Sequence, residues 1–113
     1  MHEFSIALGI VDIVTKEAEA NQAILVKEVE LEVGIASGVV EEALIFALES
    51  AVKDTILEPT RFIIHEIPAL AACHACGQRF DCEGILSVCP ACGEPTSDLI
   101  SGRELRVRSI LIE

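Results

Sequence analysis

The sequence predicts an α+β fold, in which two helices and three strands form one domain that is interrupted by a small cysteine-rich module. Two helical and three strand-like hydrophobic patterns occur along the chain, and all five cysteines lie between the last two strand patterns. The 113 residues suit one domain with a small module, and 51% hydrophobic residues can supply a core. We therefore expect one domain over residues 1–68, an inserted module over 69–102, and a last strand over 103–113 that returns to the first domain.

Both helices are predicted from apolar residues that recur at helical spacing. The first runs from Met1 to about Gln22, and the second starts at Ser37 or Gly38, either of which can cap it, and runs to Ala51. The apolar face of the first helix consists of Ile6, Ala7, Leu8, Ile10, Val11, Ile13 and Val14. That of the second consists of Val40, Ala43, Leu44, Ala47, Leu48 and Ala51. The alanines of the second helix allow close packing against a sheet.

Three segments are predicted to be strands. From Ile24 to Val33, apolar residues alternate with glutamates, which is typical of a half-buried strand with an acidic face in water. Arg61 to Ile67 is rich in β-branched residues and is bounded by prolines, and His65 within it is expected to have a structural role. Glu104 to Ile112 alternates at first and then becomes continuously apolar, which predicts the third strand.

The charge balance excludes several classes of partner. With 8 basic and 19 acidic residues, the formal net charge is −11. Such a surface repels phosphate backbones and anionic lipid headgroups, so neither a nucleic-acid nor a membrane partner is expected. It suits metal cations or a basic protein partner, although acidity also serves solubility alone.

A cytoplasmic location is expected. No segment is long and apolar enough to span a membrane, and His2 and Glu3 stand where a signal peptide carries basic residues. Two C-x2-C pairs are typical of metal ligands in a reducing compartment.

Four cysteines predict a metal site. Cys73, Cys76, Cys89 and Cys92, which we call the cysteine cluster, form the pattern C-x2-C-x12-C-x2-C, with glycine after each pair. Glycine permits a positive φ, so that backbone N–H groups can point at the sulfurs. Four thiolates satisfy tetrahedral zinc and leave no open position, which predicts a structural zinc in a zinc-ribbon-like domain. Iron, as in rubredoxin-like electron carriers, is the rival metal, and the short loop between the pairs favours zinc.

Two further residues of the module are candidate ligands. Cys82 is expected to be a small apolar filler, and the alternatives are a substitute zinc ligand or a redox-sensitive thiol. His74 competes for the metal in principle, but beside four cysteines it is expected to be exposed or adjacent to the site.

The N-terminus offers a second candidate metal site at Met1, His2 and Glu3. The α-amine of Met1 and the amide and imidazole nitrogens of His2 can chelate one ion, with the amide or carboxylate of Glu3 nearby. A nitrogen-rich tetragonal set suits Ni²⁺ or Cu²⁺, and the first amides of a helix have no intrahelical acceptor. Chemistry alone favours an ordinary exposed terminal histidine over a nickel ligand at position 2.

Several short motifs occur in a fixed order from the first residue to the last strand. They are Met1-His2-Glu3-x-Ser5, Phe46-Ala47, Ile67-Pro68, Cys89-Pro90-x-Cys92-Gly93 and Gly102-x-Glu104-Leu105. Together they resemble the HypA/HybF family of hydrogenase-maturation nickel metallochaperones. The resemblance implies a nickel-binding domain of two helices packed on a three-stranded sheet, with an inserted zinc domain. It also implies zinc on the cysteine cluster and nickel at His2, with Glu3 beside it.

The resemblance further implies partners. Nickel is expected to pass to the large subunit precursor of a nickel–iron hydrogenase with a HypB-type GTPase, and some relatives also supply urease. No enzymatic activity is expected, because the motifs assemble no nucleophile–base pair and no open metal position. A zinc-ribbon module that binds nucleic acid is the other alternative, but between Cys73 and Cys92 the only lysine or arginine is Arg79.

Overall fold

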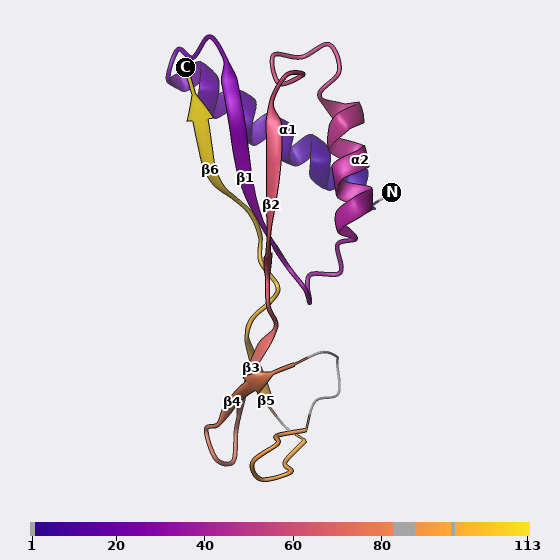
Figure 1. Cartoon of the computed structure of the whole chain (residues 1–113), viewed down its shortest axis with the longest axis vertical. Helices are drawn as coiled ribbons and strands as arrows, with labels where there is room; N and C mark the ends of the chain where they lie inside the picture. The colour runs from indigo at the N-terminus through magenta and orange to yellow at the C-terminus, as the bar shows by residue number, and fades with distance from the viewer. Residues whose placement is uncertain (1, 83–87, 96) are drawn as a thin grey trace.

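The computed structural model describes residues 2–82, 88–95 and 97–113. In chain order, the elements of these residues are α1 (His2–Ala20), β1 (Val26–Gly34), α2 (Glu41–Ala51), β2 (Arg61–Ile67), β3 (Leu70–Cys73), β4 (Arg79–Asp81), β5 (Ser97–Ser101) and β6 (Leu105–Ile112). The molecule is elongated, with extents of 55 × 27 × 16 Å (Figure 1). Its radius of gyration is 17.5 Å, against about 13 Å for a compact chain of this length. The elongation arises because two sheets lie end to end.

The larger sheet has the order β2-β1-β6, with β1 in the centre. β1 runs parallel to β2 and antiparallel to β6, so that Leu31 is in register with Ile64 on one side and Val107 on the other. In Figure 1, α1 crosses behind this sheet and α2 stands beside it. The predicted fold class, α+β with two helices on a three-stranded sheet and a zinc-ribbon-like insert, is therefore confirmed.

One face of the larger sheet and the two helices enclose the main core. Its buried residues are Ala7, Ile10, Val14, Ala18, Val26, Val29, Leu31, Val33, Leu44, Ala47, Leu48, Val52 and Leu57. The alternation in β1 was predicted correctly, but the apolar face of α1 was predicted too wide. The buried stripe of α1 is confined to one edge, so Leu8 and Ile13 are exposed, Ile13 by 55%.

The start of α2 differs from the prediction. Ser37 and Gly38 lie in the loop before the helix, and Val40 is its N-cap. The reason is local: Gly38 has φ +81, outside helical geometry, and the Ser37 hydroxyl accepts a hydrogen bond from the N–H of Val39 within the turn. Val40 was predicted on the apolar stripe of α2, but its side chain is 59% exposed.

The other face of the larger sheet carries the charged side chains of β1. Glu30 pairs with His65 of β2 at 2.7 Å, and Glu32 pairs with Arg106 of β6. A hydrogen bond from the Ser109 hydroxyl lowers the pKa of Glu30, and His65 adds to this effect. The face predicted to be acidic and wet is thus crossed by the ion pair of Glu32 with Arg106 and by hydrogen bonds, one of which joins His65 to Glu30.

A close crossing of chain segments joins the two sheets. The N–H of Ile35 donates to the carbonyl oxygen of Ile67 at 2.9 Å, and the N–H of Ala36 donates to that of Gly102 at 2.6 Å. A Cβ built on Gly34 would lie 2.0 Å from the Gly102 oxygen, so only glycine fits at position 34. The loop after β1 therefore holds both segments that lead to and from the smaller sheet.

The smaller sheet has the order β4-β3-β5, and all its pairings are antiparallel. None of these three strands was predicted from the sequence. No helix in the described ranges is long and apolar enough to cross a membrane.

Candidate metal centre

Two turns of matching geometry present the cysteine cluster. In the first turn, the N–H of Gly77 donates to the Cys73 oxygen at 3.0 Å, and in the second, that of Gly93 donates to the Cys89 oxygen at 2.8 Å. Gly77 and Gly93 have φ values of +76 and +79. The left-handed conformation predicted at both glycines is confirmed, and it reverses the chain directly after the second cysteine of each pair.

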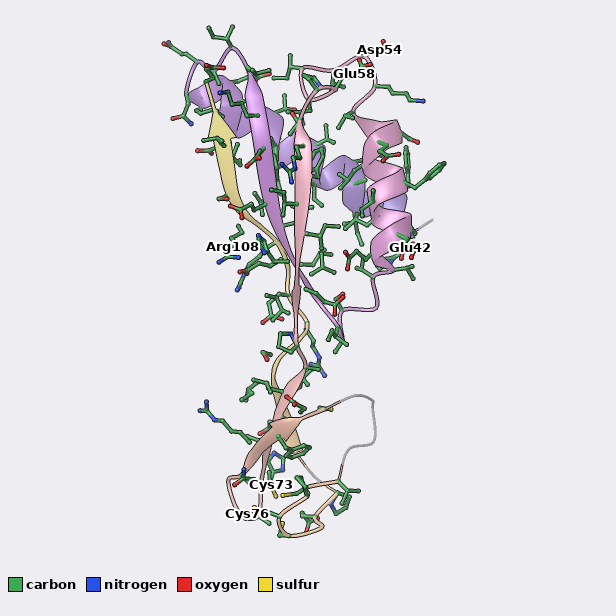
Figure 2. The ribbon with its side chains drawn as sticks, in the orientation of Figure 1. Glu42, Asp54, Glu58, Cys73, Cys76 and Arg108 are labelled. Atoms are coloured by element: carbon green, nitrogen blue, oxygen red, sulfur yellow. The ribbon has the colours of Figure 1, made fainter. Side chains whose placement is uncertain are left out.

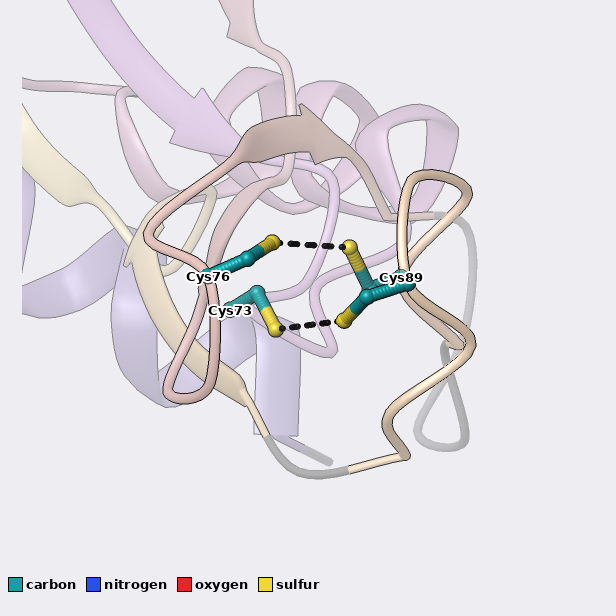
Figure 3. A group of neighbouring side chains, drawn as sticks. Cys73, Cys76 and Cys89 are labelled. Atoms are coloured by element: carbon teal, nitrogen blue, oxygen red, sulfur yellow. Dashed lines mark hydrogen bonds between the residues drawn. The ribbon is translucent and has the colours of Figure 1, made fainter.

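The four sulfurs converge on one point. All four lie within 4.8 Å of one another, and the Sγ–Sγ distances are 3.5 Å for Cys73 and Cys92 and 3.6 Å for Cys76 and Cys89 (Figure 3). Sulfurs placed 2.3 Å from a tetrahedral zinc are about 3.8 Å apart, so the observed set needs adjustments of about 1 Å or less. The donor set fits zinc, and a tetrahedral set of four sulfurs also suits iron.

The thiols of the cluster differ in acidity. Burial works against ionisation of Cys89, but the backbone N–H groups of Cys92 and Ala91 outweigh it and lower the pKa of that thiol to about 7. The N–H of Glu94 favours the Cys92 thiolate, yet hydrogen bonding with the Cys73 thiol and burial prevail and raise the pKa of Cys92 to about 12. Because zinc binds thiolates, loading zinc into the cluster would release protons.

A small apolar cluster supports the cysteine turns. Ala71 and Phe80 pack with the buried cysteines Cys73 and Cys89, and half-buried Cys82 packs against them. Cys82 lies outside the four-sulfur group. Its position fits the predicted role as a small filler, and Phe80 was not singled out from the sequence.

His74 is engaged away from the sulfurs. Its Nε2 lies 2.7 Å from Oδ2 of Asp98 in β5, and both side chains are at least half exposed. This contact joins the first cysteine turn to the neighbouring strand. Asp98 was not singled out from the sequence, because nothing in its local pattern distinguishes it.

The N-terminal candidates are arranged at the start of α1. Met1 lies outside the described residues. The His2 side chain is 62% exposed, and its Nδ1 lies 3.6 Å from Oε2 of Glu3. That same Oε2 accepts a hydrogen bond from the N–H of Val40 at 3.2 Å, which lowers the pKa of Glu3. The structure therefore brings His2 and Glu3 together and adds Val40, which the sequence did not indicate as part of this region.

The two candidate sites lie on different bodies of the molecule. Figure 2 shows Cys73 and Cys76 at one tip of the long axis, whereas Glu42, in the first turn of α2, lies beside the larger sheet. The start of α1 is held next to the start of α2 by the contact between Glu3 and Val40. The cysteine cluster and the N-terminal candidate residues are therefore kept apart.

Comparison with known proteins identifies the family. The sequence profile described as "HypA: Hydrogenase/urease nickel incorporation, metallochaperone, hypA" matches residues 1–112. The chain belongs to the HypA family. This membership confirms the resemblance inferred from the motifs and the prediction of a nickel metallochaperone of hydrogenase maturation. HypA is a maturation factor rather than a catalyst, in agreement with the expectation of no enzymatic activity.

Individual HypA proteins are similar over their whole length. "Hydrogenase maturation factor HypA" of Chlorobium phaeobacteroides (strain BS1) is 43% identical over 113 residues, covering 100% of both chains. The protein of the same name from Parabacteroides distasonis is 43% identical over 113 residues, covering 100% of this chain and 98% of its own.

Solved HypA structures share the fold. "Solution structure of HypA protein" has a TM-score of 0.75 at 21% identity and covers 100% of this chain and 97% of that chain. "Solution structure of the Ni metallochaperone HypA from Helicobacter pylori" has a TM-score of 0.69 at 20% identity and covers 97% of this chain and 96% of that chain.

Proposed function

We propose that this chain carries Ni²⁺ transiently at Met1, His2 and Glu3 and holds one Zn²⁺ permanently on the cysteine cluster. The nickel passes to the large subunit precursor of a nickel–iron hydrogenase, with a HypB-type GTPase as the partner. The observation that carries this proposal is the contrast between the two sites. Four sulfurs converge within 4.8 Å of one another, whereas the His2 side chain is 62% exposed at the start of a helix.

Zinc is the preferred resident ion because a complete sulfur tetrahedron without an open position serves structure rather than catalysis. Among its described residues, the small sheet has few buried side chains, namely Ala71, Phe80, Cys73 and Cys89, and Ala69 is buried at its entrance. So small a core needs additional fixation, which a bound metal supplies. When bound, zinc would contribute cross-linking and no reaction step.

Nickel is the preferred cargo for the N-terminus because its donors are nitrogens. The imidazole of His2 and the helix-starting amides of His2 and Glu3 form a set that suits Ni²⁺ better than Mg²⁺ or Ca²⁺. Exposed ligands exchange readily, which a delivery protein requires. The family description, nickel incorporation into hydrogenase or urease, supports nickel over copper.

The partners follow from the family and the charge. Relatives named hydrogenase maturation factor support a hydrogenase precursor as the recipient. A formal charge of −11 favours docking to basic surfaces and disfavours nucleic acid. The proposed order is nickel loading at the N-terminus, docking with the GTPase, and transfer to the large subunit.

The test is nickel calorimetry on untagged, zinc-loaded protein. The wild type should bind about one Ni²⁺ per chain, and His2→Ala should lose this binding while its zinc content stays the same. His65→Ala is the matched control, because His65 pairs with Glu30 on the open sheet face and should leave nickel binding intact. Normal nickel binding by His2→Ala would show that the proposed site is wrong.

A further inference from the structure

The carboxylate of Glu3 is tied to the second helix. Its Oε2 accepts a hydrogen bond from the backbone N–H of Val40 at 3.2 Å and lies 3.6 Å from Nδ1 of His2. The Glu3 side chain is 20% exposed, whereas that of His2 is 62% exposed. Of two neighbouring side chains, one is therefore fastened to another element and the other faces solvent.

The backbone N–H of Val40 has no acceptor within its own helix. Val40 is the N-cap of α2, and its own apolar side chain makes no capping hydrogen bond. The first N–H groups of a helix have no intrahelical acceptor. In a capping box, a glutamate of the same helix accepts the N-cap N–H, whereas here Glu3 does so from α1. Its negative charge also lies at the positive end of the α2 dipole.

We propose that the Glu3 carboxylate is a positioning group for nickel: it fastens the first turn of α1 to Val40 and so holds His2 in place. The carboxylate does not bind the metal, to which Glu3 offers only its backbone amide. This inference rests on the proposed function, since it concerns the same N-terminal site. The physical basis is preorganisation. Helix ends fray, and a ligand set that is already ordered loses less conformational entropy when the ion binds.

Two single variants remove the acceptor and the donor of the hydrogen bond between Glu3 and Val40. Glu3→Ala removes the acceptor, and Val40→Pro removes the donor while leaving Glu3 in place. Val40 has φ −84, close to the range that proline adopts. Glu3→Gln keeps an oxygen that can accept the hydrogen bond but lacks the negative charge. Glu19→Ala, at the exposed far end of α1, is the matched control.

Nickel affinity, measured by competition with a metallochromic chelator, is the first readout. Glu3→Ala and Val40→Pro should each weaken nickel binding by roughly fivefold, and Glu3→Gln and Glu19→Ala should stay within about twofold of wild type. The double variant Glu3→Ala/Val40→Pro should be no weaker than either single variant, because both remove the same contact.

Amide hydrogen exchange of Val40, measured by NMR without nickel, is the second readout. Exchange should be slow in the wild type and in Glu3→Gln, and several-fold faster in Glu3→Ala. Because this measurement needs no nickel, it separates the two proposals. Normal nickel binding by His2→Ala would refute the proposed nickel site and would still leave the Val40 exchange result standing.

Three results would overturn the inference. The first is a Glu3→Gln protein that loses nickel as strongly as Glu3→Ala, because the carboxylate would then act as a ligand or through its charge. The second is Val40 exchange that is equally fast in the wild type and Glu3→Ala, because the contact would then be absent in solution. The third is a double variant whose loss equals the two single losses combined.

Discussion

Replacing Gly34 by alanine tests the crossing that joins the two sheets. The added Cβ would lie 2.0 Å from the carbonyl oxygen of Gly102, 2.1 Å from its carbon and 2.7 Å from the nitrogen of Arg103. Non-bonded carbon and oxygen atoms come no closer than about 3.3 Å. All three obstacles are backbone atoms, so the strand and the returning segment must separate by more than about 1 Å.

The cost of that separation can be worked out from the contacts at the crossing. It breaks the bond from the Gly34 N–H to the Glu104 oxygen, 2.7 Å, and that from the Ala36 N–H to the Gly102 oxygen, 2.6 Å. Each is worth about 1 kcal/mol net, and overpacking adds about 1–3 kcal/mol. We expect Gly34→Ala to lower the free energy of unfolding by roughly 3–5 kcal/mol, or Tm by about 10–20 °C.

Urea and thermal unfolding of the zinc-loaded protein, followed by circular dichroism, measure this change. Gly9→Ala is the matched control, since a Cβ at Gly9, in the interior of α1, meets nothing within 4 Å. There the same substitution should stabilise the protein by about 0.5–1 kcal/mol. A Gly34→Ala protein within about 1 kcal/mol of wild type would refute the close crossing.

Three further changes test other parts of the structure. Gly93→Ala places alanine at φ +79 and should weaken zinc binding by roughly fivefold in a chelator competition; an unchanged affinity would contradict the turn geometry. The hydrogen bond from Ser109 lowers the pKa of Glu30 in the folded protein, so ionised Glu30 stabilises the fold at pH values above its unfolded pKa of 4.5. This stabilisation is lost as the pH falls through the lower pKa of the folded protein. The free energy of unfolding should therefore fall less steeply on acidification in Glu30→Gln than in wild type. Leu44→Ala, at a fully buried site, should lower the free energy of unfolding in urea by about 2–5 kcal/mol. Ile13→Ala, at an exposed site, should lower it by less than about 0.5 kcal/mol, and equal losses would contradict the assigned core.

Elements with strong periodicity could be predicted from the sequence. The β1 alternation of valine and leucine with glutamate fixes which face is buried, and the β-branched run Arg61–Ile67 defines β2 to the residue. The start of α2 was missed because a positive φ at Gly38 moves it past two residues that favour capping. The strands of the small sheet were missed because 3–5 residues carry too little periodicity.

The candidate sites likewise contain features that could be predicted from the sequence and contacts that could not. The cysteine cluster could be predicted because its information is local: two pairs with fixed spacing and a glycine after each. The contacts of Glu3 with Val40 and of His74 with Asp98 join residues on different elements. Such contacts depend on how the elements pack, so no spacing within one segment indicates them.

The central claim is that sulfur holds zinc and N-terminal nitrogen holds nickel. X-ray absorption at the zinc and nickel edges of untagged protein loaded with both metals tests it most directly. The account predicts four sulfur neighbours at about 2.3 Å around zinc and only nitrogen or oxygen neighbours around nickel. Thiolate sulfur around nickel, with zinc displaced from the cysteine cluster, would contradict it.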